Sequence, residues 1–330
     1  MNKRHFLHAM TMLCTAATCR AVLAQTAPAG RLPRVGILWH AASAEAEGPY
    51  FKGMIEGLRQ LGYEDKKNII LEHRFPDEVP ERFASMAAEL VALKVDVLIG
   101  VGANSSQYAK DATSTIPVVF LYVPDPVRSK LVQSLARPGG NATGLSNYAA
   151  ELTGLRMQLL KEFVPNLSRV ALLVNPNAQI STLYVEEAQR ASAKLGLTLR
   201  VFEARALRDL DNAFAAMSAA RMQGLFINAE GLFFVGREAI AKLALAHKLP
   251  LCVWSRETVE AGALLGYGPD QIAICRRAAV YVDKILKGVK AGEIPVEQPT
   301  KFDLLINGST ARALGLRIPH TLQIRSNGVI

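Results

Sequence analysis

The chain has 330 residues, of which 50% are hydrophobic and 20% charged, and its formal net charge is +9. This composition excludes a disordered or fibrous protein, and the length favours two domains over a single core. The positive charge is scattered, and its one local cluster, between residues 276 and 290, has the helical spacing of a solvated helix face. We therefore expect no nucleic-acid partner.

The first 24 residues differ from the rest of the chain. A basic start, MNKRHF, precedes a mostly small and apolar stretch without acidic residues, and small residues stand before Gln25. This pattern is typical of a signal peptide, residues 1–24, cleaved after Ala24 during export. His8 and Arg20 interrupt the apolar stretch, so an unprocessed amphipathic N-terminus is the alternative. No other segment approaches the ~18 uninterrupted apolar residues that a membrane span needs.

From residue 34 onward, short apolar runs alternate with segments of helical periodicity. Strands joined through helices need crossover connections, so the sheet that they form should be parallel. In this first series we expect strands at 34–39, 68–75, 95–101 and 116–123, with helices at 47–62, 80–93 and 105–114.

The same alternation restarts near residue 169. The repeated order predicts an α/β protein with two similar Rossmann-like lobes, each with a parallel sheet. The remaining elements, which are a strand ending at Tyr267, a helix at about 270–286 and a strand at 301–307, are too few for a third lobe and should complete the two lobes. The second series has strands at 169–175, 197–204, 223–229 and 249–255, and helices at 181–196, 207–221 and 236–248.

The stretch SLARPGGNATGLSNYAAELTG, residues 134–154, lies between the two series and is broken by Gly139, Gly140 and Gly144. Three interpretations are open: a phosphate-binding loop, a catalytic loop, or a crossing between two lobes. The stretch does not directly follow a strand, which disfavours the phosphate-binding loop.

The segment GVGANSS, residues 100–106, is the most informative candidate ligand loop. It follows a strand and opens a helix, at the edge of a parallel sheet where ligands bind. Asn104 or Ser105 could cap this helix, and its free N–H groups favour a carboxylate or a phosphate. A capped helix without a ligand is the alternative. The segment is a poor dinucleotide fingerprint, because Ser105 stands where the third glycine should be.

Other side chains near strand ends complete the set of candidates. Asp125 and Glu230 are the acids best placed for a ligand ammonium, although a turn residue or a helix cap would look the same. Aromatic side chains could stack on a flat ligand, although each one alone is more often packing. The further candidates are Trp39, Tyr50, Asn175, Asn228, Trp254 and Tyr267.

Motifs for catalysis and metal binding are missing from the sequence. It has no GxSxG, HExxH or CxxC, and no His, Cys and carboxylate cluster at metal-ligand spacing. We expect no catalytic residue, no metal and no cofactor. Cys252 and Cys275 would remain after signal cleavage, and they could either form a disulfide or be buried as thiols.

Long blocks of the sequence resemble a known family. TSTIPVVFLYVPDPVRSKLVQSLARPGGNATGLS and GYGPDQIAICRRAAVYVDKILKGVKAGEIPVEQPTKFDLLINGSTARALGLRIP are similar to signature blocks of the tryptophan-binding-like group of ABC-transporter substrate-binding proteins. GLRQLGYEDKKNIILEHRF and ERFASMAAELVALKVDVLI also fit. The resemblance covers nearly all of residues 34–325.

The resemblance implies a periplasmic binding protein, type I-like, with three crossing segments and a ligand cleft between the lobes. The N-terminal lobe would comprise 31–145 plus 266–298, and the C-terminal lobe 146–265 plus 299–330. Closure needs hinge residues that absorb changes in backbone dihedral angles. The expected hinge residues are Gly140 and Gly144 at the first crossing, Gly268 at the second and Pro299 at the third.

The resemblance also implies a class of ligand. Some members bind aromatic amino acids, but the loops WHAASAEAEG and NAEGLFF depart from the family pattern, so tryptophan is not carried over to this chain. We expect a small zwitterion or carboxylate with an apolar or aromatic group. Asn104 and Ser105 would hold its carboxylate, Asp125 or Glu230 its ammonium, Trp39, Trp254 or Tyr267 its flat part, and Asn175 and Asn228 its other polar atoms.

The function implied is that of the extracytoplasmic solute-binding component of an ABC importer, which works as a monomer and delivers its ligand to a membrane permease. Two alternatives remain open. A ligand-sensing protein for a membrane receptor would bind and close in the same way. A nucleotide-dependent oxidoreductase would need a fuller glycine fingerprint and a placed acid or base, neither of which the sequence contains.

Overall fold

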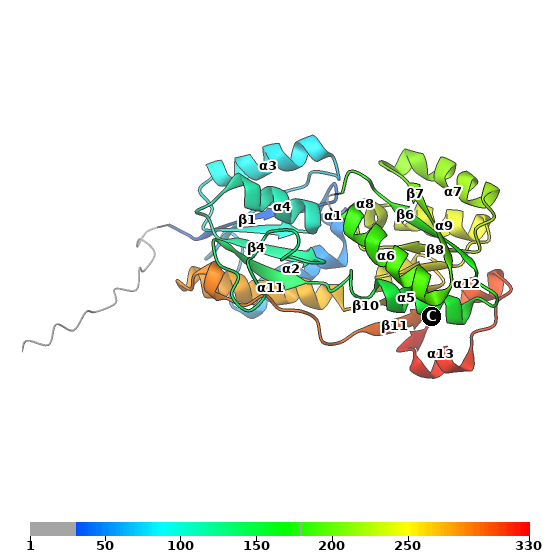
Figure 1. The fold of residues 1–330 in the computed structure, drawn as a ribbon. Helices are drawn as coiled ribbons and strands as arrows, with labels where there is room; N and C mark the ends of the chain where they lie inside the picture. Colours follow the sequence, from blue (N-terminus) through cyan, green and yellow to red (C-terminus); the bar gives the residue numbers. More distant parts are fainter. Residues whose placement is uncertain (1–30, 179) are drawn as a thin grey trace, which may run out of the picture.

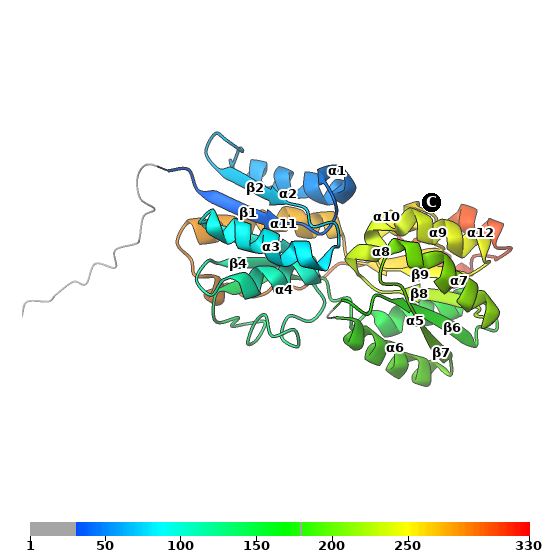
Figure 2. The ribbon, with the colours of Figure 1, turned by 90° about the horizontal axis from the view of Figure 1, so that it is seen from above.

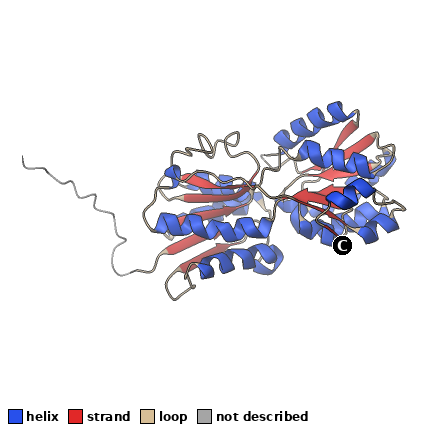
Figure 3. Cartoon of the chain, turned by 90° about the horizontal axis from the view of Figure 1, so that it is seen from below, coloured by secondary structure: helices blue, strands red, loops and turns tan. Residues whose placement is uncertain are grey.

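The computed structural model describes residues 31–178 and 180–330, so the expected signal peptide lies outside the described residues. Two α/β lobes lie side by side, and each has a central sheet with helices on both faces (Figures 1 and 3). Among the described residues, no helix is both long and apolar enough to cross a membrane.

The N-terminal lobe is built on a five-stranded parallel sheet in the order β2-β1-β3-β4-β5. All residues of β3 are buried, as expected for a strand covered on both faces. The strands are β1 (Arg34–Leu38), β2 (Ile70–Arg74), β3 (Val97–Val101), β4 (Val118–Val123) and β5 (Ala142–Ser146).

Helices from both ends of the chain cover this sheet. α2 and α11 pack together on one side, and α3 packs on α4 on the other side (Figure 2). The helices are α1 (Ala44–Glu47), α2 (Pro49–Gln60), α3 (Pro80–Ala92), α4 (Ala103–Ala112) and α11 (Gln271–Leu286), with a short 3₁₀ turn η2 (Ala291–Glu293).

The C-terminal lobe has a seven-stranded sheet in the order β12-β11-β10-β9-β8-β6-β7. The strands β6, β7, β8, β9 and β10 are parallel, as predicted. In contrast, β11 runs antiparallel to β10, and β12 runs parallel to β11. The reason is that β11 enters directly from the other lobe without a crossover helix. The strands are β6 (Arg169–Val174), β7 (Thr198–Glu203), β8 (Gly224–Ile227), β9 (Leu251–Val253), β10 (Leu265–Gly268), β11 (Asp303–Ile306) and β12 (Gly328–Val329).

Helices again lie on both faces of the second sheet. α5 packs on α6 and α13, and α7, α8 and α10 pack around α9. The helices are α5 (Thr153–Phe163), α6 (Ser181–Leu195), α7 (Leu210–Ala219), α8 (Gly231–Val235), α9 (Arg237–Ala246), α10 (Arg256–Glu260), α12 (Gly308–Ala313) and α13 (His320–Arg325), with a 3₁₀ turn η1 (Leu207–Asp209).

The chain passes between the lobes three times. The first crossing, 147–152, joins β5 to α5, and the second, 269–270, joins β10 to α11. The third follows Glu297, which still pairs with Leu145 of β5, and ends where β11 begins. β10 lies wholly in the C-terminal sheet, so the predicted boundary between 265 and 266 falls three residues too early.

The structure also corrects the expected first crossing. Gly144 lies inside β5, opposite Phe120, and a Cβ there would come within 2.0 Å of the Phe120 carbonyl oxygen. Gly140, with φ +57°, lies in the turn before β5. Both glycines therefore serve the N-terminal sheet and stand before the crossing. Gly268 ends β10 at the second crossing, and Pro299 lies in the third, where their hinge roles stay predictions.

The two described cysteines are free thiols. Cys252 is buried in β9 of the C-terminal lobe, and Cys275 is buried in α11 of the N-terminal lobe. The disulfide that the sequence left open is therefore not present in this structure.

Candidate functional site

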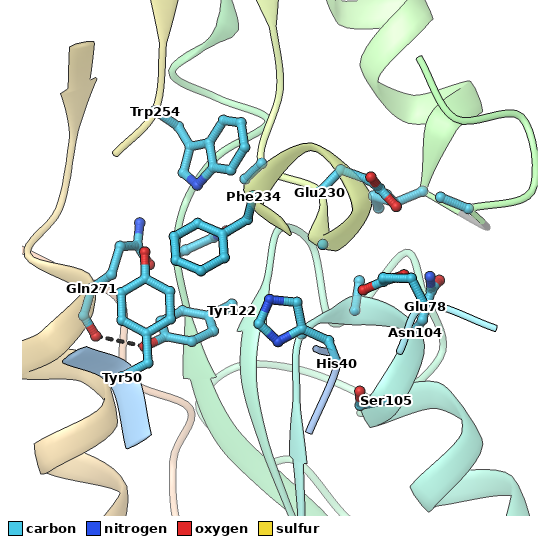
Figure 4. A pocket seen from close by; sticks show the side chains of 17 residues that line it. His40, Tyr50, Glu78, Asn104, Ser105, Tyr122, Glu230, Phe234, Trp254 and Gln271 are labelled. Carbon is cyan, nitrogen blue, oxygen red and sulfur yellow. Dashed lines mark hydrogen bonds between the residues drawn. The ribbon is translucent and has the colours of Figure 1, made fainter. Parts of the chain in front are cut away.

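A pocket of about 580 Å³ lies between the lobes, at the carboxyl ends of the parallel strands. Both lobes contribute to its wall, and the side chains form two chemically different ends (Figure 4). The larger side chains that line it are His40, Tyr50, Glu78, Asn104, Ser105, Tyr122, Glu230, Phe234, Trp254 and Gln271.

Two carboxyl groups from opposite lobes meet at the polar end. Glu78 precedes α3 in the N-terminal lobe, and Glu230 is the N-cap of α8, where it accepts a hydrogen bond from the Phe233 N–H at 3.2 Å. A Cβ on Gly231 would come within 1.8 Å of Glu78 Oε1, so the glycine lets Glu78 approach α8 closely. Glu78 is therefore placed beside Glu230 across the interface between the lobes.

Neither carboxyl group of this pair ionises as it would in water. Burial, together with repulsion from Glu230, raises the pKa of Glu78 to about 8, although His40 and Asn104 oppose the rise. Burial also raises the pKa of Glu230, against hydrogen bonds from Asn175 and the Phe233 N–H. A positively charged group on a ligand would stabilise the ionised form of both.

His40 carries the positive charge at this end of the pocket. Burial by itself would lower the pKa of His40, but the nearby carboxylates of Glu47, Glu78 and Glu230 outweigh it and raise the pKa to about 9. Its Nδ1 lies 2.8 Å from Glu47 Oε1, which also accepts the N–H groups of His40 and Ala41 at 3.0 and 2.8 Å. His40 is therefore an imidazolium at neutral pH.

The start of α4 offers hydrogen-bond donors beside these charges. The N–H groups in the first turn of a helix have no partner within the helix, and α4 has no side-chain cap. Ser105 Oγ donates to the Trp39 carbonyl at 2.7 Å, which fixes the helix start against β1. The free N–H groups, the helix dipole and His40 together favour a carboxylate at this position.

Aromatic rings form the other end of the pocket. Tyr50 stacks on Phe234 of the opposite lobe at 4.7 Å between centroids, and Tyr122 lies 5.6 Å from Tyr50. Tyr122 has φ +60° at a register shift between β4 and β5, and this irregular backbone places its ring in the pocket wall. Trp254 follows β9 and completes the aromatic end (Figure 4).

Hydroxyl groups of this aromatic end are bonded to the walls. Tyr50 Oη donates to Glu257 Oε2 at 3.1 Å and so links α2 to α10 across the lobes. Tyr122 Oη donates to the Gln271 carbonyl at 2.6 Å (Figure 4) and lies 2.8 Å from Cys275 Sγ. These hydrogen bonds fix the orientation of the Tyr50 and Tyr122 rings in the pocket wall.

Four of the nine predicted ligand-binding residues line the pocket: Asn104, Ser105, Glu230 and Trp254. Asn175 stands one step behind them, because its Nδ2 donates to Glu230 Oε1 at 3.1 Å. Contacts of these residues with a ligand stay predictions.

The other four predicted residues lie elsewhere. Trp39 is fully buried against Phe75 and donates to His73 Nδ1, so it belongs to the core. Asp125 accepts the Val127 and Arg128 N–H groups and is a turn residue. Asn228 accepts a hydrogen bond from Thr153 Oγ1, and Tyr267 stacks on Phe302 outside the pocket. Trp39 and Asp125 do not line this pocket, and their contact with a ligand stays a prediction.

Several residues of the pocket were not among the predicted ligand-binding residues. His40 directly follows Trp39, and consecutive side chains beyond a strand point in opposite directions. Glu78 reaches the pocket from the turn before α3, Phe234 from within α8 and Gln271 from the start of α11, so none of them directly follows a strand. Tyr50 was recognised only as one of several aromatic candidates.

The family model of ABC transporter substrate binding proteins matches residues 39–330, and the chain belongs to this family. The resemblance inferred from the sequence blocks is thereby confirmed. Proteins of this family bind substrates for ABC transporters, and the family is one of binding proteins, not of enzymes.

Relatives agree with this assignment. The chain is 26% identical over 266 residues, 81% of this chain, to 76% of a tyrosine-binding protein of Clostridioides difficile. It superposes on a conserved domain protein of Vibrio cholerae with a TM-score of 0.85 at 28% identity. It superposes on an ABC domain from Streptococcus pneumoniae, solved in complex with L-Trp, with a TM-score of 0.84 at 24% identity. Each structure matches 91% of this chain and 100% of its own.

Proposed function

We propose that this protein is the extracytoplasmic solute-binding component of an ABC importer and that its ligand is an aromatic L-amino acid. The observation that carries this proposal is the polarity of the pocket, which has charged groups at one end and four aromatic rings at the other (Figure 4). The relative from Clostridioides difficile, named as tyrosine-binding, supports the same ligand class.

The charged end matches the two head groups of an amino acid. The ammonium would sit between Glu78 and Glu230, where it would stabilise both carboxylates. The carboxylate would accept hydrogen bonds from the first turn of α4, beside His40. The ring would then extend toward Tyr50, Phe234 and Trp254.

The transport role depends on closure and release. The protein works as a monomer in the periplasm, where its two lobes trap the ligand at their interface. A membrane permease then opens the lobes and receives the ligand. The proposal requires no nucleophile or base in the pocket, because the ligand is bound and released unchanged.

A thermal-shift screen of the purified protein against the twenty amino acids tests the ligand class. We expect L-tyrosine, L-phenylalanine or L-tryptophan to raise the melting temperature, because a ligand at 100 times its Kd stabilises the folded state by about 2.7 kcal/mol. Glu230→Gln should weaken binding by about tenfold or more, since it removes a charged partner of the ammonium. Glu238→Gln, an exposed carboxylate on α9, is the matched control. No shift with any amino acid, or chemical conversion of the bound one, would refute the proposal.

A further inference from the structure

Gln271 has a buried side-chain amide whose nitrogen makes no hydrogen bond to the described residues. It is the first residue of α11, it is only 5% exposed, and it forms part of the pocket wall between Tyr122 and Trp254. Within residues 31–178 and 180–330, its Nε2 has no hydrogen-bond partner. Buried amides in native proteins are nearly always bonded, and leaving one unbonded is unfavourable.

The local fold does not need this amide. The cap of α11 is Asp270, whose side chain accepts the Ala273 N–H at 2.9 Å. The bond that ties Gln271 to Tyr122 uses its backbone carbonyl, which any residue would supply. The side chain is therefore free to bond with whatever fills the aromatic end of the pocket.

Neighbouring groups restrict what this partner can be. Tyr50 already donates its hydroxyl proton to Glu257, and Tyr122 donates its own to Gln271. Figure 4 shows the indole nitrogen of Trp254 on the side of the ring that faces Phe234, and an indole N–H can only donate. This end thus offers donors from Trp254 and Gln271, together with the lone pairs of two phenol oxygens.

Charge narrows the partner further. Glu257 lies beside Tyr50, and burial raises its pKa, which shows that negative charge is disfavoured there. A second carboxylate at this end would meet the same penalty. A neutral group that both accepts and donates fits the donors and lone pairs, and a phenol hydroxyl is such a group.

We propose that Gln271 is a specificity-determining residue whose side-chain amide hydrogen-bonds a hydroxyl at the far end of the ligand ring. The site then favours L-tyrosine over L-phenylalanine, which lacks the hydroxyl, and over L-tryptophan, whose indole N–H cannot accept. This inference rests on the proposed function, because it presumes an aromatic amino acid in the pocket.

Calorimetry on the unaltered protein gives the first test. L-tyrosine should bind about tenfold or more tightly than L-phenylalanine, because the unsubstituted ring leaves the buried amide unpaired. L-tryptophan should also bind more weakly than L-tyrosine. Equal affinities for L-tyrosine and L-phenylalanine, or a preference for L-tryptophan, would overturn the role of Gln271 and leave the proposed function standing. Failure of all three to bind would instead refute the proposed function.

Substitution gives the second test. Gln271→Met keeps the length of the side chain and removes its hydrogen-bonding groups. It should lower the affinity for L-tyrosine by about tenfold and leave that for L-phenylalanine unchanged, so that the preference disappears. Gln189→Met, on the exposed face of α6, is the matched control and should keep the preference. A Gln271→Met protein that retains the full tyrosine preference contradicts the inference.

Discussion

Glu78 and Glu230 come from different lobes and face the same pocket with raised pKa values. In the unliganded protein their mutual repulsion opposes closure, and a proton on one of them relieves it. The ammonium of an amino acid would replace that proton. Binding of the ligand and ionisation of this pair are therefore linked.

The linkage predicts how stability depends on pH. The pKa of Glu78 is about 8 in the folded protein and near its ordinary value of 4.5 in the unfolded chain. Folding thus takes up a proton between these two values, and the free energy of unfolding should fall as pH rises from about 4.5 to about 8. Glu78→Gln removes the part of this dependence that Glu78 causes. We expect its melting temperature without ligand to exceed that of the unaltered protein by about 2–5 °C at pH 8, and to match it at pH 5.

Melting curves from pH 5 to pH 9 check this expectation. The exposed Glu81, in the first turn of α3, supplies the control variant Glu81→Gln. The same variant Glu78→Gln should bind amino acids more weakly, because one partner of the ammonium is lost. Parallel melting curves for Glu78→Gln and the unaltered protein would show that Glu78 is ionised freely in the folded state.

Individual residues show how far the sequence could predict the site. The expectation that ligands bind where parallel strands end selected the loops that carry Asn104, Ser105, Glu230 and Trp254. It could not decide between Trp39 and His40, because the direction of a side chain beyond a strand depends on the packing of Phe51 and Phe75 around Trp39. Tyr122 was hidden for another reason, since a bulge inside β4 turns its ring into the pocket.

At the scale of elements, Arg156 of α5 links two of the crossings. Its Nη1 donates to the Ala149 carbonyl in the first crossing at 3.1 Å, and its Nε donates to the Tyr267 carbonyl beside the second at 2.7 Å. The side chain is fully buried, and burial lowers its pKa to about 10. One guanidinium thus holds both crossings against the C-terminal lobe.

Arg156→Met tests this link. The two carbonyls would lose their donors inside the protein, so we expect the free energy of unfolding to fall by about 2–4 kcal/mol. Hydrogen exchange should become faster in 147–152 and 267–270, and unchanged in the strands of the N-terminal sheet. Arg59→Met is the control, because Arg59 is exposed on α2 and pairs with Glu56 of its own helix. Unchanged exchange in both crossings would contradict the role of Arg156.

Element order was largely predictable, because the alternation of apolar runs and amphipathic helices is regular from residue 34 to residue 255. The position of the crossings was not. The sequence predicts Gly140 and Gly144 as hinge glycines, whereas Gly144 is required by the close approach of β5 to the Phe120 carbonyl. A glycine needed for packing and one needed for motion look alike in a sequence.

At the scale of the whole molecule, contacts join the two lobes on both sides of the pocket. Tyr50 bonds Glu257 and stacks on Phe234 at one side, and Arg128 of the N-terminal lobe pairs with Glu186 of α6 at 2.6 Å on the other. Hinged binding proteins close around their ligand. Any contact that exists only when the lobes are closed therefore adds to the apparent ligand affinity.

The pair of Arg128 and Glu186 allows this to be measured away from the pocket, since neither residue lines it. Arg128→Glu would place a second carboxylate beside Glu186 when the lobes are closed. Asp125 and Glu187, whose charges also act on Arg128, would add to the repulsion. We expect the affinity for L-tyrosine to fall about two- to fivefold, as is usual for an exposed pair, and the loss to shrink at high salt. Glu186→Arg combined with Arg128→Glu restores an opposite-charge pair and should recover most of the affinity. If Arg128→Glu leaves the affinity unchanged at low salt, closure of the lobes does not bring these two side chains together when the ligand binds.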